Sequence, residues 1–331
     1  MREIAADIKR LAQDLCSSDP ANEFNSASLW EKVRELGLDR IGIEEDRGGS
    51  GGSIEDLATT VSAFAEQGVT LPFVENAAAM MAFTADGRFD EDWATFATGR
   101  DEISLKGETV SGFVRNVPWM GSTQTAVIHV ADIGLIAVTT AEDDVRVTDL
   151  GVSIAGEPLA TVVLDNTKAR VLEVDAKGVI ARWQLLDMVA LVGFAHGAHS
   201  LTRGYVKQRV QFGKPLIEIP SVAANLAQMS IYLLLADAAI RRALETVDLS
   251  ESSGTLTSTR VVVAQATTTV ARISHQLHGA MGTTREYPLH RFTRNIWARR
   301  DRANSQHAAA LNLGRIALNG GEPEIWDVLT R

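Results

Sequence analysis

The chain has 331 residues, which is long enough for two or three domains with substantial cores. Its 45% hydrophobic and 6% aromatic residues are typical of a helical protein rich in alanine and leucine. The net charge of −10 argues against a protein that coats nucleic acid or an anionic membrane. Cys16 is the only cysteine, which excludes an intrachain disulfide and disfavours a cysteine-based metal site.

The N-terminal residues predict an amphipathic helix and no signal peptide. Ile4, Ile8, Leu11 and Leu15 fall on one face at helical spacing, without an uninterrupted apolar core. The longest apolar run, Met188 to Ala195, is much shorter than a membrane span. We therefore expect a cytoplasmic protein that binds neither membrane nor nucleic acid.

A glycine-rich connector separates the next two predicted helices. The first of these is expected over Ser28–Leu36. The connector lacks the Gly-Lys-Ser/Thr of a phosphate loop and a strict GxGxxG pattern. We expect a flexible connector in which Ser53 caps the following helix. The helical pattern then continues to about Ala97, with interruptions near Pro72 and at Asp86-Gly87.

From about Asp101, short β-prone runs separated by turn residues predict a small antiparallel sheet or barrel. These runs are Glu102–Leu105, Val110–Val114, Ala126–Val130, Gly134–Val138, Val145–Val147, Ala160–Leu164 and Val171–Val174. The helical period returns after Gly178, with helices expected over Val179–Arg209, Ser221–Val247, Thr255–His278 and Leu289–Leu318. The chain is thus predicted to be mainly α with a central β domain. Its expected divisions are a helical domain (1–98), a shortened β domain (99–177) and a C-terminal helical bundle (178–331).

The stretch most informative about function connects two of these helices. It is Arg203–Ser221, RGYVKQRVQFGKPLIEIPS. Arg209 offers a planar, permanently charged guanidinium group that suits phosphate oxygens. Phe212 offers a flat apolar face for a ring, and Gly213 allows a turn without a Cβ clash. The same residues also fit an ordinary loop between helices, in which Arg209 pairs with a local carboxylate.

A second stretch, QLHGAMGTTREYPLHR, begins about 65 residues later at Gln276. The pair RVQFGKPL and QLHGAMGTTREYPLHR, in this order and spacing, resembles the C-terminal half of the acyl-CoA dehydrogenase family. These flavoproteins introduce a double bond next to a thioester. The resemblance covers most of the chain from about Leu29 and is closest from Val179 onward. It implies an N-terminal helical domain, a small β barrel or sheet, and a C-terminal four-helix bundle.

The resemblance also implies that the two motifs contact the pyrophosphate and adenosine side of an FAD held mainly by a neighbouring subunit. The chemistry agrees, because Arg209 and the Gln276 amide can donate to phosphate oxygens and Gly279 permits close backbone approach. Ala280 departs from the family pattern, in which a second glycine is usual. The implied cofactor-binding residues are Arg209, Gln211, Phe212, Leu216, Gln276, Leu277, Gly279 and Ala280.

The residues that perform the chemistry in that family are missing here. Desaturation needs a carboxylate that removes the α-proton and a flavin that accepts the β-hydride. The two positions at which family members carry this glutamate correspond to Trp183 and Ala303, and neither side chain accepts a proton. The family's flavin-facing Thr-Glu-Pro-x-x-Gly-Ser-like segment is also absent between Phe96 and Gly121.

The chain thus keeps the motifs for the ADP side of the FAD but lacks the catalytic glutamate and the flavin-facing segment. This combination predicts the short, degenerate subunit of a bacterial heteromeric (α2β2-type) acyl-CoA dehydrogenase. We expect activity only with a second, catalytically complete subunit that supplies the glutamate. The expected cofactor is an FAD shared at the subunit interface, and the expected acyl-CoA substrate is bulky, such as a steroid side chain. An electron-transfer flavoprotein is the expected electron acceptor. Two alternatives stay open: a self-sufficient homo-oligomeric flavoenzyme with an unusual base, and a flavin-free structural or binding relative.

Other polar residues have both functional and structural interpretations. Asp187 and Asp301 are candidates for a displaced base, although helix-surface aspartates are usually solvated or salt-bridged. We expect His278 to pack near the cofactor and not to transfer protons. His196 and His199 are spaced as metal ligands, but no third ligand is apparent, so we expect interface packing and no metal site. The arginines between 285 and 302 suit nucleic acid or a CoA phosphate, or, as we favour, acidic neighbours at a subunit interface.

Overall fold

The computed structural model describes residues 2–17, 26–88, 92–99, 103–168, 170–246, 253–302, 307–315 and 318. Packing divides the chain into two compact units. The bundle unit comprises residues 1–18, 58–69 and 184–331, and the sheet unit comprises residues 19–57 and 70–183. Along the sequence, helices precede Ala94, strands extend to Leu172 and helices resume at Ala176. The division into three domains, with boundaries at 98/99 and 177/178, stays a prediction.

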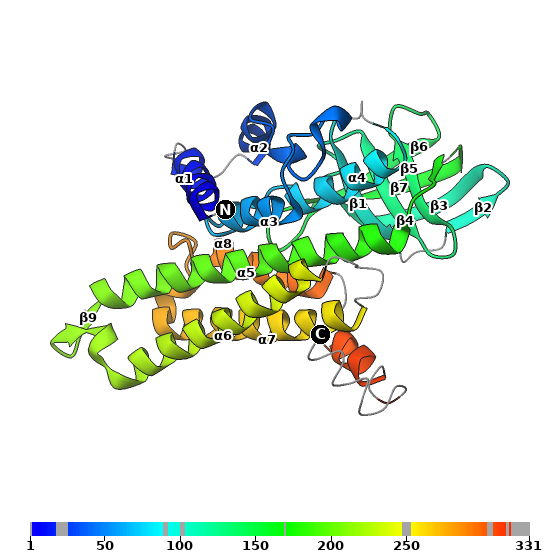
Figure 1. The fold of residues 1–331 in the computed structure, drawn as a ribbon. Helices are drawn as coiled ribbons and strands as arrows, with labels where there is room; N and C mark the ends of the chain where they lie inside the picture. Colours follow the sequence, from blue (N-terminus) through cyan, green and yellow to red (C-terminus); the bar gives the residue numbers. More distant parts are fainter. Residues whose placement is uncertain are drawn as a thin grey trace. The chain divides into compact units, whose positions relative to one another are not determined.

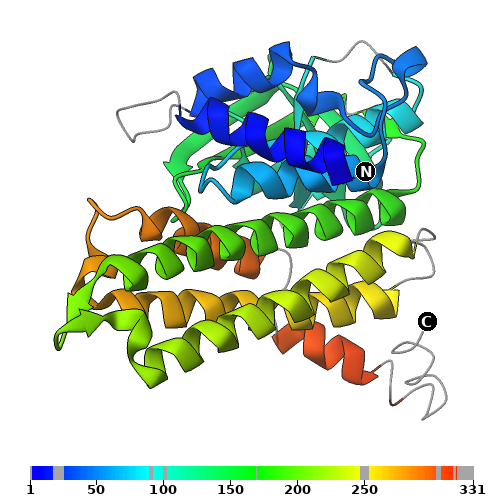
Figure 2. The ribbon, with the colours of Figure 1, turned by 60° about the vertical axis from the view of Figure 1, so that its left-hand side comes forward.

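The bundle unit is built on four helices, as Figures 1 and 2 show. They are α5 (Ala176–Gln208), α6 (Pro220–Glu245), α7 (Ser253–His278) and α8 (Leu289–Arg302). The N-terminal helix α1 (Arg2–Ser17) and the end of α3 (Ile54–Ala65) complete this unit. The sequence predicted most of these bounds to within three residues, because long periodic segments are the most reliable signal.

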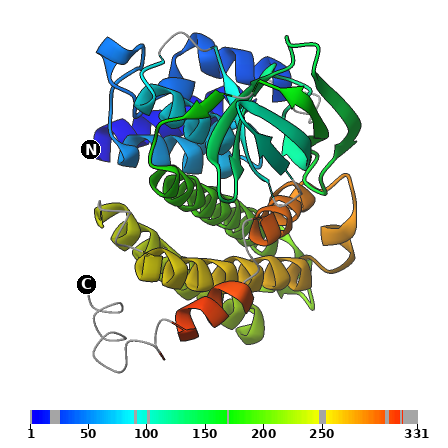
Figure 3. The ribbon, with the colours of Figure 1, turned by 90° about the vertical axis from the view of Figure 1, so that its right-hand side faces the viewer.

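The last predicted helix, Leu289–Leu318, is wrong as a single element. Helix α8 ends at Arg302, and residues 307–315 form a separate helical stretch that is not collinear with it (Figure 3). Residues 303–306 lie outside the described residues.

Two glycines on α5 allow this helix to approach the end of α3 closely. A Cβ atom on Gly193 would lie 2.8 Å from the carbonyl oxygen of Ser62, and one on Gly197 would lie 2.6 Å from that of Glu66. The Cβ atom on Gly197 would also clash with the Phe292 ring of α8. These two positions therefore set the spacing between the helices of the bundle unit.

The sheet unit contains two four-stranded sheets. The first has the order β1 (Ala94–Gly99), β4 (Thr125–Val130), β5 (Gly134–Thr139) and β8 (Arg170–Leu172), with β1 and β4 parallel. The second has the order β2 (Ile103–Lys106), β3 (Thr109–Pro118), β7 (Pro158–Thr167) and β6 (Val145–Val152), all antiparallel. Their shared apolar core includes Val114, Ile128, Ile136 and Val162. All seven predicted strands are confirmed.

One stretch was predicted with the wrong secondary structure. The helical pattern was expected to reach about Ala97, but helix α4 (Phe73–Ala85) ends earlier and residues 94–99 form β1. Short apolar runs are ambiguous between helix and strand. Pairing with β4, in the register Phe96 to Val127, decides in favour of a strand.

The glycine-rich connector between α2 (Ser26–Glu35) and α3 is a hydrogen-bonded loop and not a flexible tether. The amide of Gly42 donates to the carbonyl of Gly51 at 2.9 Å, and the amide of Gly51 donates to that of Ile43 at 2.8 Å. The predicted cap is confirmed. The Ser53 amide donates to Asp56 Oδ2 at 2.9 Å, and Ser53 Oγ accepts from the Asp56 amide at 3.3 Å.

Two described helices are long and apolar enough to cross a membrane by length and composition alone. In α5, 78% of the apolar window is buried inside the protein, as in a core helix. In α6 only 22% of the window is buried, so this helix presents an apolar face.

Gly197→Ala is expected to destabilise the chain, because the added methyl group would force α5 away from α3 and Phe292. Overpacking of this kind costs about 1–3 kcal/mol. The matched control is Gly204→Ala on the same helix, where the added Cβ would meet nothing within 4 Å. The control should be neutral or stabilising by up to about 1 kcal/mol. Urea denaturation of both variants checks this, and equal midpoints would contradict the packing argument.

Candidate functional site

The connection between α5 and α6 is a tight β-hairpin. Strand β9 (Val210–Gln211) pairs with β10 (Lys214–Pro215), and the turn between them is Phe212-Gly213. Both turn residues have positive φ, 54° and 78°, as in a type I′ turn. Glycine tolerates this conformation, whereas an aromatic residue is strained in it. The Phe212 side chain is 85% exposed, so burial does not offset this strain.

Arg209 lies at the base of this hairpin. Its amide donates to the carbonyl of Tyr205 at 2.8 Å, and its carbonyl accepts from the amide of Leu216 at 2.9 Å. The guanidinium group is exposed and makes no hydrogen bond or ion pair with the described residues. The alternative in which Arg209 pairs with a local carboxylate is therefore wrong within the described part of the chain. Gln211 is exposed, and Leu216 is half-buried in the short helix η3 (Leu216–Glu218).

The second motif lies at the same end of the bundle, because α5 and α7 run in the same direction, each antiparallel to α6 (Figure 2). Tyr205 on α5 stacks on His278 at the end of α7, with ring centroids 4.4 Å apart. Tyr287 packs against both rings, with centroids 5.7 Å from Tyr205 and 4.9 Å from His278. These contacts join two motifs that are distant in the sequence. The sequence interpretation missed both tyrosines, since an isolated tyrosine carries no spacing signal.

His278 is buried within this cluster. Its Nδ1 lies 2.7 Å from the carbonyl oxygen of Ser274, and burial lowers the pKa of its imidazole. A neutral ring in a packed cluster agrees with the expectation that His278 does not transfer protons.

The turn that follows α7 exposes its backbone. Gly279 has a φ of 58°, and a Cβ atom added there would meet nothing within 4 Å. Gln276, Gly279 and Ala280 are exposed and Leu277 is half-buried. This end of the bundle therefore presents an unpaired cation, a strained exposed ring and an accessible glycine backbone. Such groups fit the phosphates and the flat base of a dinucleotide.

The two positions of the family's catalytic glutamate hold no base. Trp183 is 3% exposed and packs on Phe96 of β1, with centroids 5.5 Å apart. Ala303 lies outside the described residues. Strand β1 ends at Gly99 and β2 begins at Ile103, so only three residues separate the two strands.

The two candidate displaced bases are both engaged in ion pairs. Asp187 is fully buried, and its Oδ1 accepts a hydrogen bond of 2.8 Å from the buried guanidinium group of Arg299. Asp301 is exposed and accepts hydrogen bonds of 2.8 and 2.9 Å from Arg300. These hydrogen bonds lower the pKa of Asp301. A carboxylate so stabilised is a weaker proton acceptor.

The remaining polar residues form contacts between helices. His196 Nε2 lies 2.9 Å from Asp237 Oδ1, and Ser230 Oγ lies 3.2 Å from His199 Nε2. Burial lowers the pKa of His196, but the hydrogen bond and charge of Asp237 outweigh it and the net shift is upward. The two histidines therefore contact α6 of their own chain, and their packing at an interface stays a prediction. Arg299 and Arg300 likewise pair with acidic residues of their own chain.

Comparison with known proteins identifies the family. Residues 181–300 match the family model described as the acyl-CoA dehydrogenase C-terminal domain. The curated protein "Acyl-CoA dehydrogenase FadE34" of Mycobacterium tuberculosis is 30% identical over 92% of this chain and 46% of its own length. The chain thus spans about half the length of that relative.

Solved structures show the fold. A chain of the Tcur3481-Tcur3483 steroid ACAD superposes with a TM-score of 0.86 at 18% identity, covering 96% of this chain and 98% of that one. A chain of the ChsE4-ChsE5 complex from Mycobacterium tuberculosis gives 0.86 at 16% identity, covering 97% and 98%. The mainly α fold with a central β region is confirmed. Residues 181–300 thus match the C-terminal domain of the acyl-CoA dehydrogenase family, and the described chain has the fold of the solved ACAD chains.

Proposed function

We propose that this chain is the non-catalytic-type subunit of a heteromeric FAD-dependent acyl-CoA dehydrogenase. In this assembly it contributes the ADP-side half of an FAD site, and a second subunit supplies the catalytic glutamate. One observation carries the proposal. The exposed end of the bundle keeps Arg209 and Phe212 positioned for a dinucleotide, whereas Trp183 stands buried where the base is required.

The residues of this chain would bind and orient the cofactor. Arg209 would donate to the pyrophosphate oxygens, and Phe212 would lie against the flat adenine. The open backbone at Gly279 allows close approach of the dinucleotide. When bound, the flavin accepts a hydride from the β-carbon of the acyl thioester. The second subunit's glutamate would remove the α-proton. In this chain the two corresponding positions hold Trp183 and Ala303, and neither side chain accepts a proton.

An apolar face on α6 supports the requirement for a partner. Ile231, Leu234 and Leu235 are 58%, 67% and 53% exposed and share one helix face. Three large apolar side chains in one exposed row are typical of a subunit interface. Because one similar solved structure is named a steroid ACAD, we propose a bulky acyl-CoA such as a steroid side chain as substrate. An electron-transfer flavoprotein would reoxidise the flavin, and the assembly would be cytoplasmic.

The chain purified alone should hold little FAD, and the complex with its partner should hold about one FAD per heterodimer. The reason is that each chain of this type supplies only one half of a site. Flavin absorbance measured against protein concentration checks both values. One tightly bound FAD per isolated chain would instead favour a self-sufficient homo-oligomer, and a flavin-free complex would favour a structural or binding relative.

Arg209→Ala should weaken FAD binding by the complex about ten- to a hundredfold, the usual effect of losing a charge-assisted hydrogen bond of roughly 1.5–3 kcal/mol. The matched control is Arg241→Ala, which removes an exposed arginine from α6. Titration of the apo-complex with FAD measures both. Equal dissociation constants for the two variants would remove Arg209 from the site.

Asp301→Asn should change turnover of the assembled enzyme only a few-fold, because Asp301 pairs with Arg300. Replacing the partner's glutamate with glutamine should lower turnover by a factor of about 10² to 10⁴. The assay is acyl-CoA-dependent reduction of an artificial electron acceptor. A collapse in rate from Asp301→Asn, with assembly and flavin content intact, would show that this chain supplies the base. Asp187→Asn is unsuitable for this test, since Arg299 would then be buried without its counter-charge, at about 3–5 kcal/mol.

A further inference from the structure

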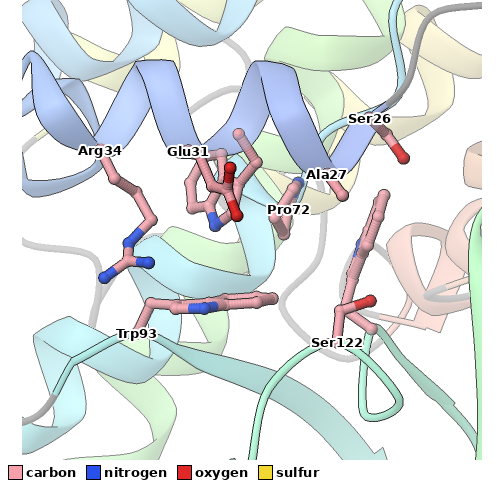
Figure 4. A pocket seen from close by; sticks show the side chains of 9 residues that line it. Ser26, Ala27, Glu31, Arg34, Pro72, Trp93 and Ser122 are labelled. Carbon is pink, nitrogen blue, oxygen red and sulfur yellow. The ribbon is translucent and has the colours of Figure 1, made fainter.

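The sheet unit contains a cavity of about 240 Å³ that none of the proposed flavin-binding residues lines (Figure 4). Its walls include Trp30, Trp93, Trp119 and Pro72, with Glu31 and Arg34 on α2. Half of the six tryptophans of the chain therefore meet at this one cavity. We call it the tryptophan pocket. Its volume is roughly eight times the ~30 Å³ that one water occupies in the liquid, which suits a compound of one or two rings.

Trp119, which lines the pocket, has a strained backbone conformation. Trp119 has a φ of 62°, a conformation that is rare for a bulky aromatic residue. The strain is held by three hydrogen bonds: the Trp119 amide donates to Pro158 at 2.8 Å, and the Trp119 carbonyl accepts from Ser122 and Thr123 at 2.7 and 3.1 Å. Strained residues that the surrounding structure fixes in this way cluster at binding sites.

The pocket is also rich in hydrogen-bond donors that lack acceptors. Nε1 of Trp30, Nε1 of Trp119 and Nε of Arg34 are buried without a hydrogen-bond partner among the described residues. Indole and guanidinium nitrogens only donate, so each requires an acceptor oxygen.

The charged residues around the pocket indicate which class of ligand it can bind. Arg34 pairs with Asp92, and Glu31 is exposed at the rim. The negative charge of Glu31 would repel a carboxylate ligand, and the positive charge of Arg34 would repel a quaternary ammonium ligand. A neutral carbonyl oxygen meets neither obstacle. The indole faces favour a flat apolar body.

We propose that the tryptophan pocket binds a small, neutral ring compound that carries a carbonyl oxygen. The ring would lie among Trp30, Trp93 and Trp119, and the oxygen would accept hydrogen bonds from the indole N–H groups. This site is independent of the proposed flavin site, and it adds a binding activity to that function.

The test uses a matched pair of probes on the full chain without flavin. They are 1-tetralone, which carries a ring ketone, and tetralin, the same two rings without oxygen. Calorimetric titration should show 1-tetralone binding about tenfold more tightly than tetralin. Trp119→Phe and Trp30→Phe keep a ring but remove one donor each, so each should reduce this preference about threefold, within the usual effect of one hydrogen bond.

The control is Trp183→Phe, which removes another buried indole N–H without a partner that lies outside the pocket lining. It should leave the preference unchanged. Equal binding of the two probes would overturn the proposal, as would tighter binding of phenyltrimethylammonium or a pocket that takes up neither probe and holds only water. If Trp119→Phe does not fold, Trp30→Phe decides the outcome. Because no flavin is present, failure here leaves the proposed dehydrogenase function untouched.

Discussion

The close approach of α5 to the end of α3 and to Phe292 is the constraint on which the bundle unit depends. It exists because Gly193 and Gly197 present no side chain to the carbonyl oxygens of Ser62 and Glu66. Most of the apolar window of α5, 78% of it, is buried, and the polar groups in a buried stretch require hydrogen-bond partners. Asp187 is the one fully buried carboxylate on this helix, and it is neutralised by Arg299 of α8.

The ion pair between Asp187 and Arg299 makes Asp187 an unsuitable catalytic base. A carboxylate that is hydrogen-bonded to a buried arginine is held at a fixed position, where it stabilises structure. Burial lowers the pKa of the nearby Arg260, and the charge of Asp187 partly offsets this shift. The acidic residue nearest to the family's base position is thus committed to folding, which agrees with an assembly in which another subunit supplies the base.

The two family motifs depend on a different contact. The Tyr205–His278 stack joins the last turn of α5 to the last turn of α7. The hairpin that carries Arg209 and the turn that carries Gly279 leave from these two turns. A rigid aromatic cluster beneath them, including Tyr287, holds both motifs at one end of the bundle while their polar groups stay exposed. Preorganisation of this kind lowers the entropic cost of binding a large cofactor.

The sequence by itself determined the long helices, the seven strands of the central β region and the two cofactor motifs. Periodicity and motif spacing are local properties, and they survive without knowledge of contacts. The family resemblance also led to the prediction that Trp183 occupies a position where a base is expected. The tertiary structure alone decided that residues 94–99 form a strand, because an apolar run of that length is settled by its partner β4. Only the structure showed that Asp187 is buried against Arg299, that Tyr205 meets His278, and that Trp30, Trp93 and Trp119 surround one cavity. Each of these depends on side chains that lie far apart in the chain, and no spacing rule connects residues that meet only through packing.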